Sequence, residues 1–90
     1  MANVDLVQLT EQTKKLTAMV VEDEGVANEL LSSTFKNFFS EVSSAFNGKE
    51  AIEMFERIKP DIVFVDIVMP EMDGIELSRR LREINPNQII

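Results

Sequence analysis

Cysteine and histidine, two residue types that often carry chemistry, are absent from this 90-residue sequence. Without cysteine there is no disulfide framework and no thiolate metal site. Without histidine, an imidazole-based catalytic triad and most zinc sites are excluded. No apolar run approaches the roughly 18 residues that would predict a membrane span, and Met1 to Leu16 has no apolar core of signal-peptide type. We therefore expect a cytoplasmic protein that does not contact the membrane.

Basic residues are scarce relative to acidic ones. The chain has 9 Lys and Arg against 16 Asp and Glu, a formal net charge of −7. This balance argues against direct binding to nucleic acid or to an anionic membrane, because both need a basic surface. It suits a protein that holds a divalent cation or meets a basic patch on a partner. The length fits one small domain, and the 44% hydrophobic content is that of a globular chain.

Short apolar runs alternate with stretches of helical periodicity. Strands are predicted at Leu16–Val21, Glu41–Phe46 and Asp61–Asp66, and Gln88–Ile90 is typical of the start of a fourth. Helices are predicted between them, each from apolar residues at helical spacing. The three apolar sets are Val26, Leu30, Leu31, Phe35 and Phe38 on a helix over Gly25–Asn37; Ala51, Ile52, Phe55 and Ile58 on a helix that Lys59-Pro60 ends; and Ile75, Leu77, Leu81 and Ile84 on a helix that Asn85-Pro86 ends.

The resulting order is β-α-β-α-β-α-β. Strands that alternate with helices favour a parallel sheet covered on both faces. Residues 1–15 precede this pattern and are expected to form an arm or a short helix. We expect four of the phenylalanines to be core residues: Phe35, Phe38, Phe39 and Phe55.

Acidic residues stand at two of the predicted strand ends. Glu22 and Asp23 follow the first strand, and Asp66 ends the third. In open parallel sheets, functional groups gather beyond the carboxyl ends of the strands. Carboxylates about 4 Å apart repel by about 4 kcal/mol per pair at an effective dielectric constant near 20. A hard cation such as Mg²⁺, or a proton taken up by one carboxylate, relieves this repulsion.

Plainer interpretations exist for each acidic residue. Glu22, Asp23 and Glu24 also suit a solvated helix start, where the helix dipole favours negative charge. Asp66 would also suit a simple strand end, although four apolar residues precede it and an ionised carboxylate in such a setting is costly unless paired. For Asp73-Gly74, turn and helix-cap chemistry is the preferred interpretation.

The motifs taken together are more specific than each alone. Met19 to Glu24 (MVVEDE), Asp66 to Pro70 (DIVMP) and Met72-Asp73-Gly74, in this order, closely resemble the response-regulator receiver family of two-component signalling. Asn47 to Ala51 (NGKEA) and Lys59 to Val63 (KPDIV) also resemble segments of that family. The resemblance covers about residues 17–90. It implies a flavodoxin-like, doubly wound parallel sheet with strand order 2-1-3-4-5.

The resemblance also implies roles for individual residues. Asp66 corresponds to the phosphoacceptor. Asp23, Asp66 and the backbone carbonyl of Val68 correspond to Mg²⁺ ligands, and Glu22 to an acidic neighbour that acts through metal-bound water. Asp is commoner than Glu at the position of Glu22, which affects the spacing of the metal site. The implied phosphoryl donor is a phosphohistidine on a sensor histidine kinase or a phosphotransfer protein.

The sequence departs from the family pattern at its end. It stops at Ile90, before the family's hydroxyl residue at the end of strand 4 and its lysine at the end of strand 5. Residues 16–90 are therefore expected to form a partial receiver that lacks the rest of strand 4, helix 4, strand 5 and helix 5. Apolar surface around the first helix and third strand would then be open. We expect the chain to form a homodimer, exchange elements with a second copy, or pack its arm over this surface.

Two other functions compete with the phosphoacceptor module. One is an interaction or assembly module of receiver ancestry that does not switch by phosphorylation, which the absent lysine and hydroxyl residue favour. The other is an aspartate-nucleophile phosphatase of the haloacid dehalogenase type. Such phosphatases resemble this chain at the nucleophile but carry a second Asp two residues later, where this sequence has Val68. We therefore expect no enzymatic turnover of an external substrate.

Overall fold

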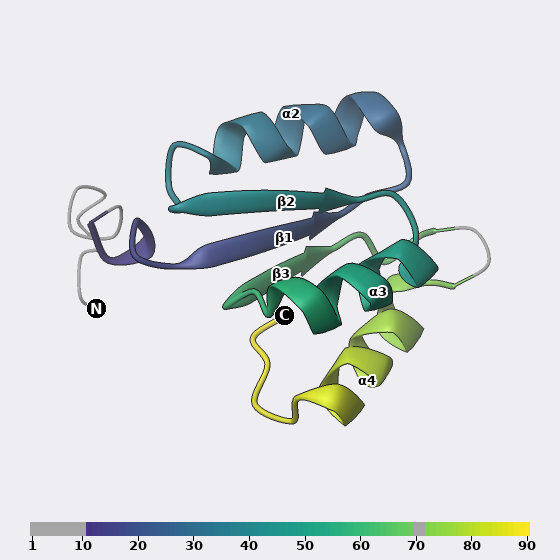
Figure 1. The fold of residues 1–90 in the computed structure, drawn as a ribbon. Helices are drawn as coiled ribbons and strands as arrows, with labels where there is room; N and C mark the ends of the chain where they lie inside the picture. Colours follow the sequence, from purple (N-terminus) through teal and green to yellow (C-terminus); the bar gives the residue numbers. More distant parts are fainter. Residues whose placement is uncertain (1–10, 70–71) are drawn as a thin grey trace, which may run out of the picture.

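The computed structural model describes residues 11–69 and 72–90. Helices and strands alternate along the chain, as predicted (Figure 1). Within the described residues, no helix combines the length and apolar composition needed to cross a membrane. The elements are β1 (Thr17–Val21), α2 (Gly25–Phe35), β2 (Glu41–Ala45), α3 (Gly48–Ile58), β3 (Ile62–Val65) and α4 (Gly74–Ile84).

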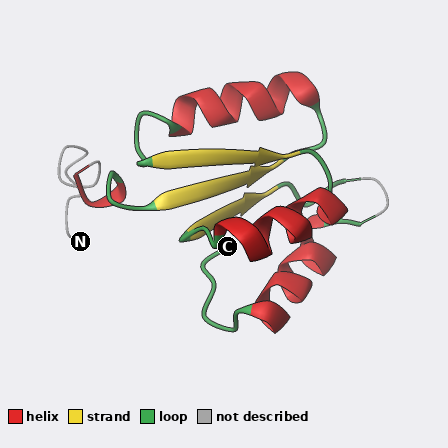
Figure 2. Cartoon of the chain, in the orientation of Figure 1, coloured by secondary structure: helices red, strands yellow, loops and turns green. Residues whose placement is uncertain are grey.

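The strands form a parallel sheet with the order β2-β1-β3 (Figure 2). A single parallel bridge between Ile62 and Ile89 places the end of the chain beside β3. The order of the first three strands and the position of the incipient fourth are those of the predicted flavodoxin-like sheet. The predicted strands are confirmed, although the fourth is present only as this bridge.

Side-chain caps at the helix starts fix where the chain turns from strand to helix. Glu24, Asn47 and Asp73 are the N-caps of α2, α3 and α4. Each accepts a hydrogen bond from a backbone N–H three residues later, at 2.7–2.8 Å. The cap interpretation of Asp73 is confirmed. Lys59 closes α3 in the left-handed conformation, with φ of 53°.

The hydrophobic core lies between the sheet and the pair α3 and α4, on the face opposite α2 (Figure 1). Alternate residues of β1 and β3 point to this face, as the period of a strand requires. The helices α3 and α4 contribute part of the apolar sets that the sequence pattern selected, whereas Ile75 and Ile84 are exposed. The buried cluster consists of Met19, Val21, Ala45, Ala51, Phe55, Val63, Met69, Leu77 and Leu81.

The burial of α2 differs from the expectation. The helix is present, but Val26 is 73% exposed and Leu30 66% exposed. The side chains that α2 buries are polar, namely Asn28 and Ser32. The helix packs on β1 and β2, where Ser44 offers a hydroxyl to Ser32 at 2.6 Å. Val26 and Leu30 therefore lie on a side of α2 on which no described element packs, as expected for an open apolar surface around this helix.

The aromatic residues near α2 are only partly core residues. Phe39 is buried, and Phe35 stacks on Phe64 of β3 with a centroid distance of 4.3 Å. Phe55 is buried in the main core. Phe38 is exposed, so its assignment to the core was wrong. It lies in the turn after α2, where Phe39 is the side chain that reaches Phe35 and Phe64.

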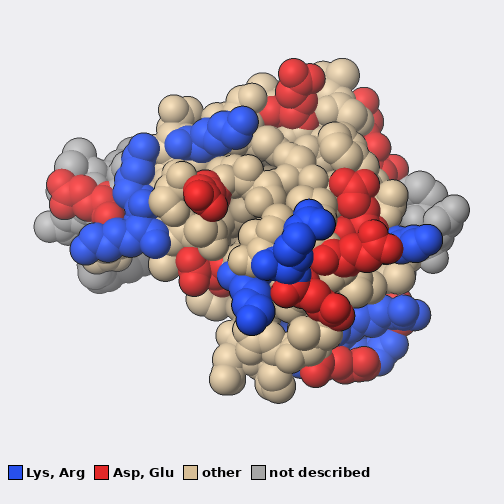
Figure 3. All heavy atoms as spheres, viewed as in Figure 1, with Lys and Arg blue, Asp and Glu red and all other residues tan. Residues whose placement is uncertain are grey.

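Charged side chains cover much of the surface. On the face shown in Figure 3, Lys and Arg side chains occur among Asp and Glu side chains, and several basic side chains lie next to one another at the left. Among the described residues, the ion pairs all lie on α4 and join Arg79 and Arg80 to Glu76, and Arg79 to Glu83.

Candidate functional site

The acidic residues of the sequence pattern emerge from neighbouring strands. Val21 and Val65 are paired in the parallel ladder between β1 and β3, so the residues that follow them leave the sheet side by side. Glu22 follows Val21, and Asp66 follows Val65. The ladder continues into the site, because the N–H of Asp66 donates to the carbonyl of Val21 at 3.0 Å.

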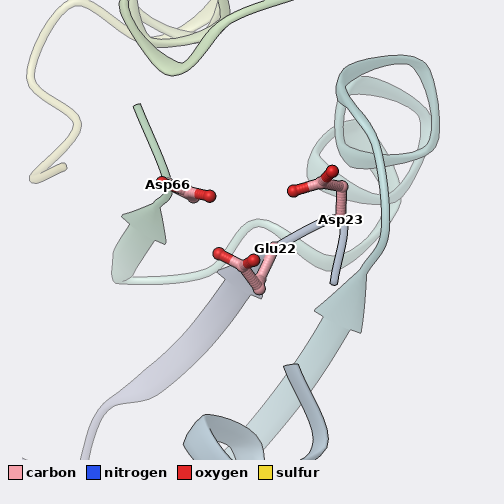
Figure 4. A group of neighbouring side chains, drawn as sticks. All are labelled: Glu22, Asp23 and Asp66. Carbon is pink, nitrogen blue, oxygen red and sulfur yellow. The ribbon is translucent and has the colours of Figure 1, made fainter. Parts of the chain in front are cut away.

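Asp23, the third acidic residue, lies in the short loop between β1 and α2. Each of Glu22, Asp23 and Asp66 offers a carboxylate oxygen, and these three oxygens all lie within 4.8 Å of one another. Figure 4 shows the three side chains pointing toward a common space at the carboxyl end of the sheet. Glu22 and Asp66 are half-buried and Asp23 is exposed. The predicted convergence is therefore present in the structure.

Crowding of like charges alters the acid–base properties of the cluster. Partial burial is the main cause that raises the pKa of Glu22 above its usual value. A side-chain hydrogen bond with Asp66 and the negative charges of Asp66 and Asp23 raise this pKa further, whereas a hydrogen bond from the N–H of Glu24 lowers it. A proton or a cation is thus held more favourably here than by isolated carboxylates.

The ligand atoms suit a hard divalent cation. Mg²⁺ prefers oxygen ligands, and it commonly takes one or two carboxylates while keeping several waters. The three converging carboxylate oxygens offer this chemistry, and the exposed side of the cluster leaves room for water. Glu22, Asp23 and Asp66 therefore fit Mg²⁺ as a bound ion.

Val68, the remaining predicted ligand, lies in the loop after β3. Its N–H donates to Oδ1 of Asp66 at 3.2 Å, and its side chain is 80% exposed. The hydrogen bond places its backbone directly beside the phosphoacceptor candidate. The assignment of its carbonyl as a ligand stays a prediction.

Gly74 supports the site in a way that the sequence pattern did not reveal. It begins α4, and its N–H donates to the carbonyl of Ile67 at 2.8 Å. A Cβ at this position would lie 2.3 Å from the carbonyl oxygen of Asp66. The loop that carries Asp66 therefore packs directly on the backbone of α4, which only glycine permits. The Asp73-Gly74 pair indicated a turn and cap, but not this contact.

Asn28 is the second residue whose role the sequence did not show. It is 1% exposed, and its amide nitrogen donates to the carbonyls of Glu22 and Ala45, each at 2.9 Å. It thereby joins α2 to the ends of β1 and β2. An asparagine within a helical pattern is most often solvent-facing, so nothing in the sequence indicated its burial.

Comparison with known proteins identifies the family. Residues 18–90 match the family model of the response regulator receiver domain. The chain is 39% identical over 70 residues to chemotaxis protein CheY of Thermotoga maritima, covering 77% of this chain and 58% of that protein. It is 42% identical over 64 residues to protein-glutamate methylesterase/protein-glutamine glutaminase 3 of Paramagnetospirillum magneticum, covering 69% of this chain but only 18% of that protein.

Solved structures agree with this result. The N-terminal domain of an uncharacterized Wolinella succinogenes protein is 35% identical with a TM-score of 0.75, over 82% of this chain and 60% of that one. The receiver domain of the Arabidopsis thaliana histidine kinase CKI1, solved with Mg²⁺ and BeF₃⁻, is 27% identical with a TM-score of 0.74, over 88% of this chain and 62% of that one. The chain thus spans about three fifths of these receiver chains. It belongs to the response regulator receiver domain family of two-component signalling.

Proposed function

We propose that this chain is a phosphoacceptor module in which Asp66 receives a phosphoryl group with the help of Mg²⁺. The observation that supports it is the convergence of the carboxylates of Glu22, Asp23 and Asp66 within 4.8 Å at the carboxyl end of the sheet. In the proposed site, Asp23, Asp66 and the carbonyl of Val68 bind the ion directly, and Glu22 acts through a bound water.

The proposed step is an in-line displacement at phosphorus. A carboxylate oxygen of Asp66 attacks the phosphoryl group, so that a P–O bond forms while the P–N bond of a phosphohistidine breaks. The electron pair of the broken bond stays on the imidazole, which takes up a proton, and an aspartyl phosphate remains. Mg²⁺, when bound, neutralises charge on the transferring group and on the carboxylates.

The proposed donor is a sensor histidine kinase or a phosphotransfer protein. Family membership supports this partner class. The carboxylates that the structure places beside Asp66 are those of Glu22 and Asp23, which the proposal assigns to the ion rather than to acid–base chemistry on an external substrate. The module is therefore proposed to carry a signal rather than to act as an enzyme.

A mass measurement tests the proposal. The chain is incubated with acetyl phosphate and Mg²⁺, and the intact mass is recorded. We expect one phosphoryl adduct in the wild type, none in Asp66→Asn, and none when Mg²⁺ is removed by a chelator. Asp73→Asn is the matched control, because asparagine keeps the helix cap and the residue lies outside the cluster. An adduct in Asp66→Asn equal to that of the wild type rejects the proposal.

The exposed apolar face of α2 favours a second candidate, a receiver-derived interaction module. Val26 and Leu30 are exposed on a helix whose polar residues are buried. In this alternative, association with a partner does not depend on Mg²⁺ or on Asp66. Equal self-association of the wild type and Asp66→Asn, with and without Mg²⁺, combined with the absence of a phosphoryl adduct, would favour it over the phosphoacceptor.

A further inference from the structure

Charge repulsion acts on the acidic loop between β1 and α2, so that another part of the fold has to hold this loop in place. Glu22 and Asp23 repel each other and Asp66, and the ion pairs among the described residues all lie on α4, away from this loop. Without a bound cation, the repulsion favours conformations in which the carboxylates move apart. Asp23 is exposed, so its side chain has little packing to resist such movement.

Asn28 supplies a restraint on the backbone of this loop. The regular ladder between β1 and β2 ends at the pair Val21 and Ala45, and the N–H of Glu22 still donates to the carbonyl of Ala45 at 3.1 Å. The next group, the carbonyl of Glu22, accepts from the amide nitrogen of Asn28 at 2.9 Å. The same amide nitrogen donates to the carbonyl of Ala45 at 2.9 Å. The side chain therefore links Glu22, one residue beyond the end of β1, to Ala45, the last residue of β2.

The orientation of the Glu22 carbonyl determines where Asp23 lies. The peptide group between Glu22 and Asp23 is planar, so a hydrogen bond that fixes the carbonyl also fixes the plane from which Asp23 leaves. The amide nitrogen of Asn28 holds the carbonyls of Glu22 and Ala45, whereas its Oδ1 accepts from the hydroxyl of Ser32 at 3.2 Å. Ser32 is in turn hydrogen-bonded to Ser44 of β2.

We propose that Asn28 is a positioning residue for the metal site, which holds Glu22 and Asp23 within reach of Asp66 before any ion binds. The inference rests on the proposed function of the acidic cluster. Asn28 does not contact the ion or the phosphoryl group. Its effect is to keep the ligands arranged in advance, so that binding the ion does not also have to order the loop.

The test combines metal binding and hydrogen exchange, both followed by NMR. Mg²⁺ is titrated into the wild type and into Asn28→Leu and Asn28→Ala, and the amide shifts around Asp66 give the dissociation constant. Both variants lose the two donated hydrogen bonds, and leucine keeps the volume of the buried side chain. We expect the dissociation constant for Mg²⁺ to rise about tenfold or more, the range found for residues that orient metal ligands.

Ser32→Ala is the matched control. Ser32 lies one turn along the same helix, is buried and belongs to the same network, but does not touch the carbonyls of Glu22 or Ala45. Its loss destabilises the same interface while leaving both hydrogen bonds from the Asn28 nitrogen in place. We expect its Mg²⁺ affinity to stay within about twofold of the wild type, since a merely structural effect does not reach the ligands.

Amide exchange in the metal-free protein provides the second measurement. In the Asn28 variants, we expect faster exchange at the N–H groups of Glu22 and Glu24 and unchanged exchange in the centre of β1. Unchanged exchange at Glu22 and Glu24, or an equal loss of Mg²⁺ affinity in Ser32→Ala, overturns the inference. If the wild type does not bind Mg²⁺, the proposed function fails, and the exchange measurement still decides whether Asn28 orders the loop.

Discussion

At the scale of single residues, Asp66 combines a stability cost with its proposed function. Its carboxylate faces those of Glu22 and Asp23, and the pKa of Glu22 is raised mainly by partial burial and further by this crowding. Without a bound cation, a fold that holds several like charges together is less stable than one in which a neutral side chain replaces one of them. Stability and metal binding are therefore expected to change in opposite directions when Asp66 is altered.

Replacement of Asp66 by Asn tests whether stability and Mg²⁺ binding change in opposite directions. We expect metal-free Asp66→Asn to be more stable than the wild type by ~0.5–1 kcal/mol, because one partly exposed like charge is removed. We also expect Mg²⁺ to raise the melting temperature of the wild type but not that of the variant, since an ion stabilises the state that binds it. Thermal unfolding followed by circular dichroism, with and without Mg²⁺, measures both effects. A lower stability of the metal-free variant would contradict this account.

Gly74 has a steric role at the same site. We expect Gly74→Ala to destabilise the fold by about 1–3 kcal/mol, as overpacking does, because a Cβ would lie 2.3 Å from the carbonyl oxygen of Asp66. Phosphorylation by acetyl phosphate should also fall, since the loop after β3 has to move. Gly25→Ala is the control, because nothing lies within 4 Å of its Cβ position. Equal stability of the two variants in urea unfolding would refute the close contact.

At the scale of elements, α4 is stabilised by its surface charges. Glu76 pairs with Arg79 at 2.7 Å and with Arg80 at 3.0 Å, one turn along the helix. Hydrogen bonds from Arg79 and Arg80 lower the pKa of Glu76 from 4.5 to about 2. The helix also has an acidic residue in its first turn and a basic one in its last, which complements the helix dipole.

The lowered pKa of Glu76 gives α4 a pH dependence. A carboxyl group whose pKa is lower in the folded state contributes stability above its unfolded pKa and loses it as the pH falls. The contribution of Glu76 is therefore complete above 4.5 and disappears as the pH falls toward about 2. We compare the free energy of unfolding of the wild type with that of Glu76→Gln from above pH 4.5 down toward pH 2. The difference between the two free energies should shrink as the pH falls and as salt is added. A constant difference would contradict the ion-pair explanation.

At the scale of the whole molecule, apolar surface is open on two sides. Val26 and Leu30 are exposed on α2, and a groove between β3 and α4 is lined by Ile67, Ile75 and Ile90, among others. Among the described residues, the outer edge of β3 is paired through a single bridge, between Ile62 and Ile89. Exposed apolar patches and unpaired edges favour association.

We therefore predict that the 90-residue chain self-associates. Sedimentation velocity at increasing protein concentration should show a dimer or larger species. Leu30→Glu and Ile75→Glu each add a charge to one of the two surfaces, and the variant that shifts the chain toward monomer identifies the surface used. Glu53→Gln, on the exposed side of α3, is the control. A compact, cooperatively unfolding monomer at all concentrations, unchanged by deletion of residues 1–10, would disprove the prediction.

The strands, the helices and the acidic strand ends are readable from the sequence because each depends on local pattern. The apolar runs before Glu22 and Asp66 define strands, and the cap at Asp73 defines where α4 begins. Once the strands are parallel and adjacent, residues that follow them meet at one edge of the sheet. The candidate site was therefore predictable from sequence without side-chain coordinates.

Only the tertiary structure decided which groups surround that site. The periodicity of α2 predicted a buried apolar face, yet Val26 is exposed and Asn28 is buried, because the face turned to β2 meets the hydroxyl of Ser44 and the carbonyl of Ala45. The contact of Gly74 with Asp66 likewise joins segments whose distance depends on how α4 packs. The sequence alone determined the strands, the helices and the position of Asp66 at a strand end. Burial and contact depend on neighbours far along the chain, so they were decided by the packing of elements rather than by any local pattern.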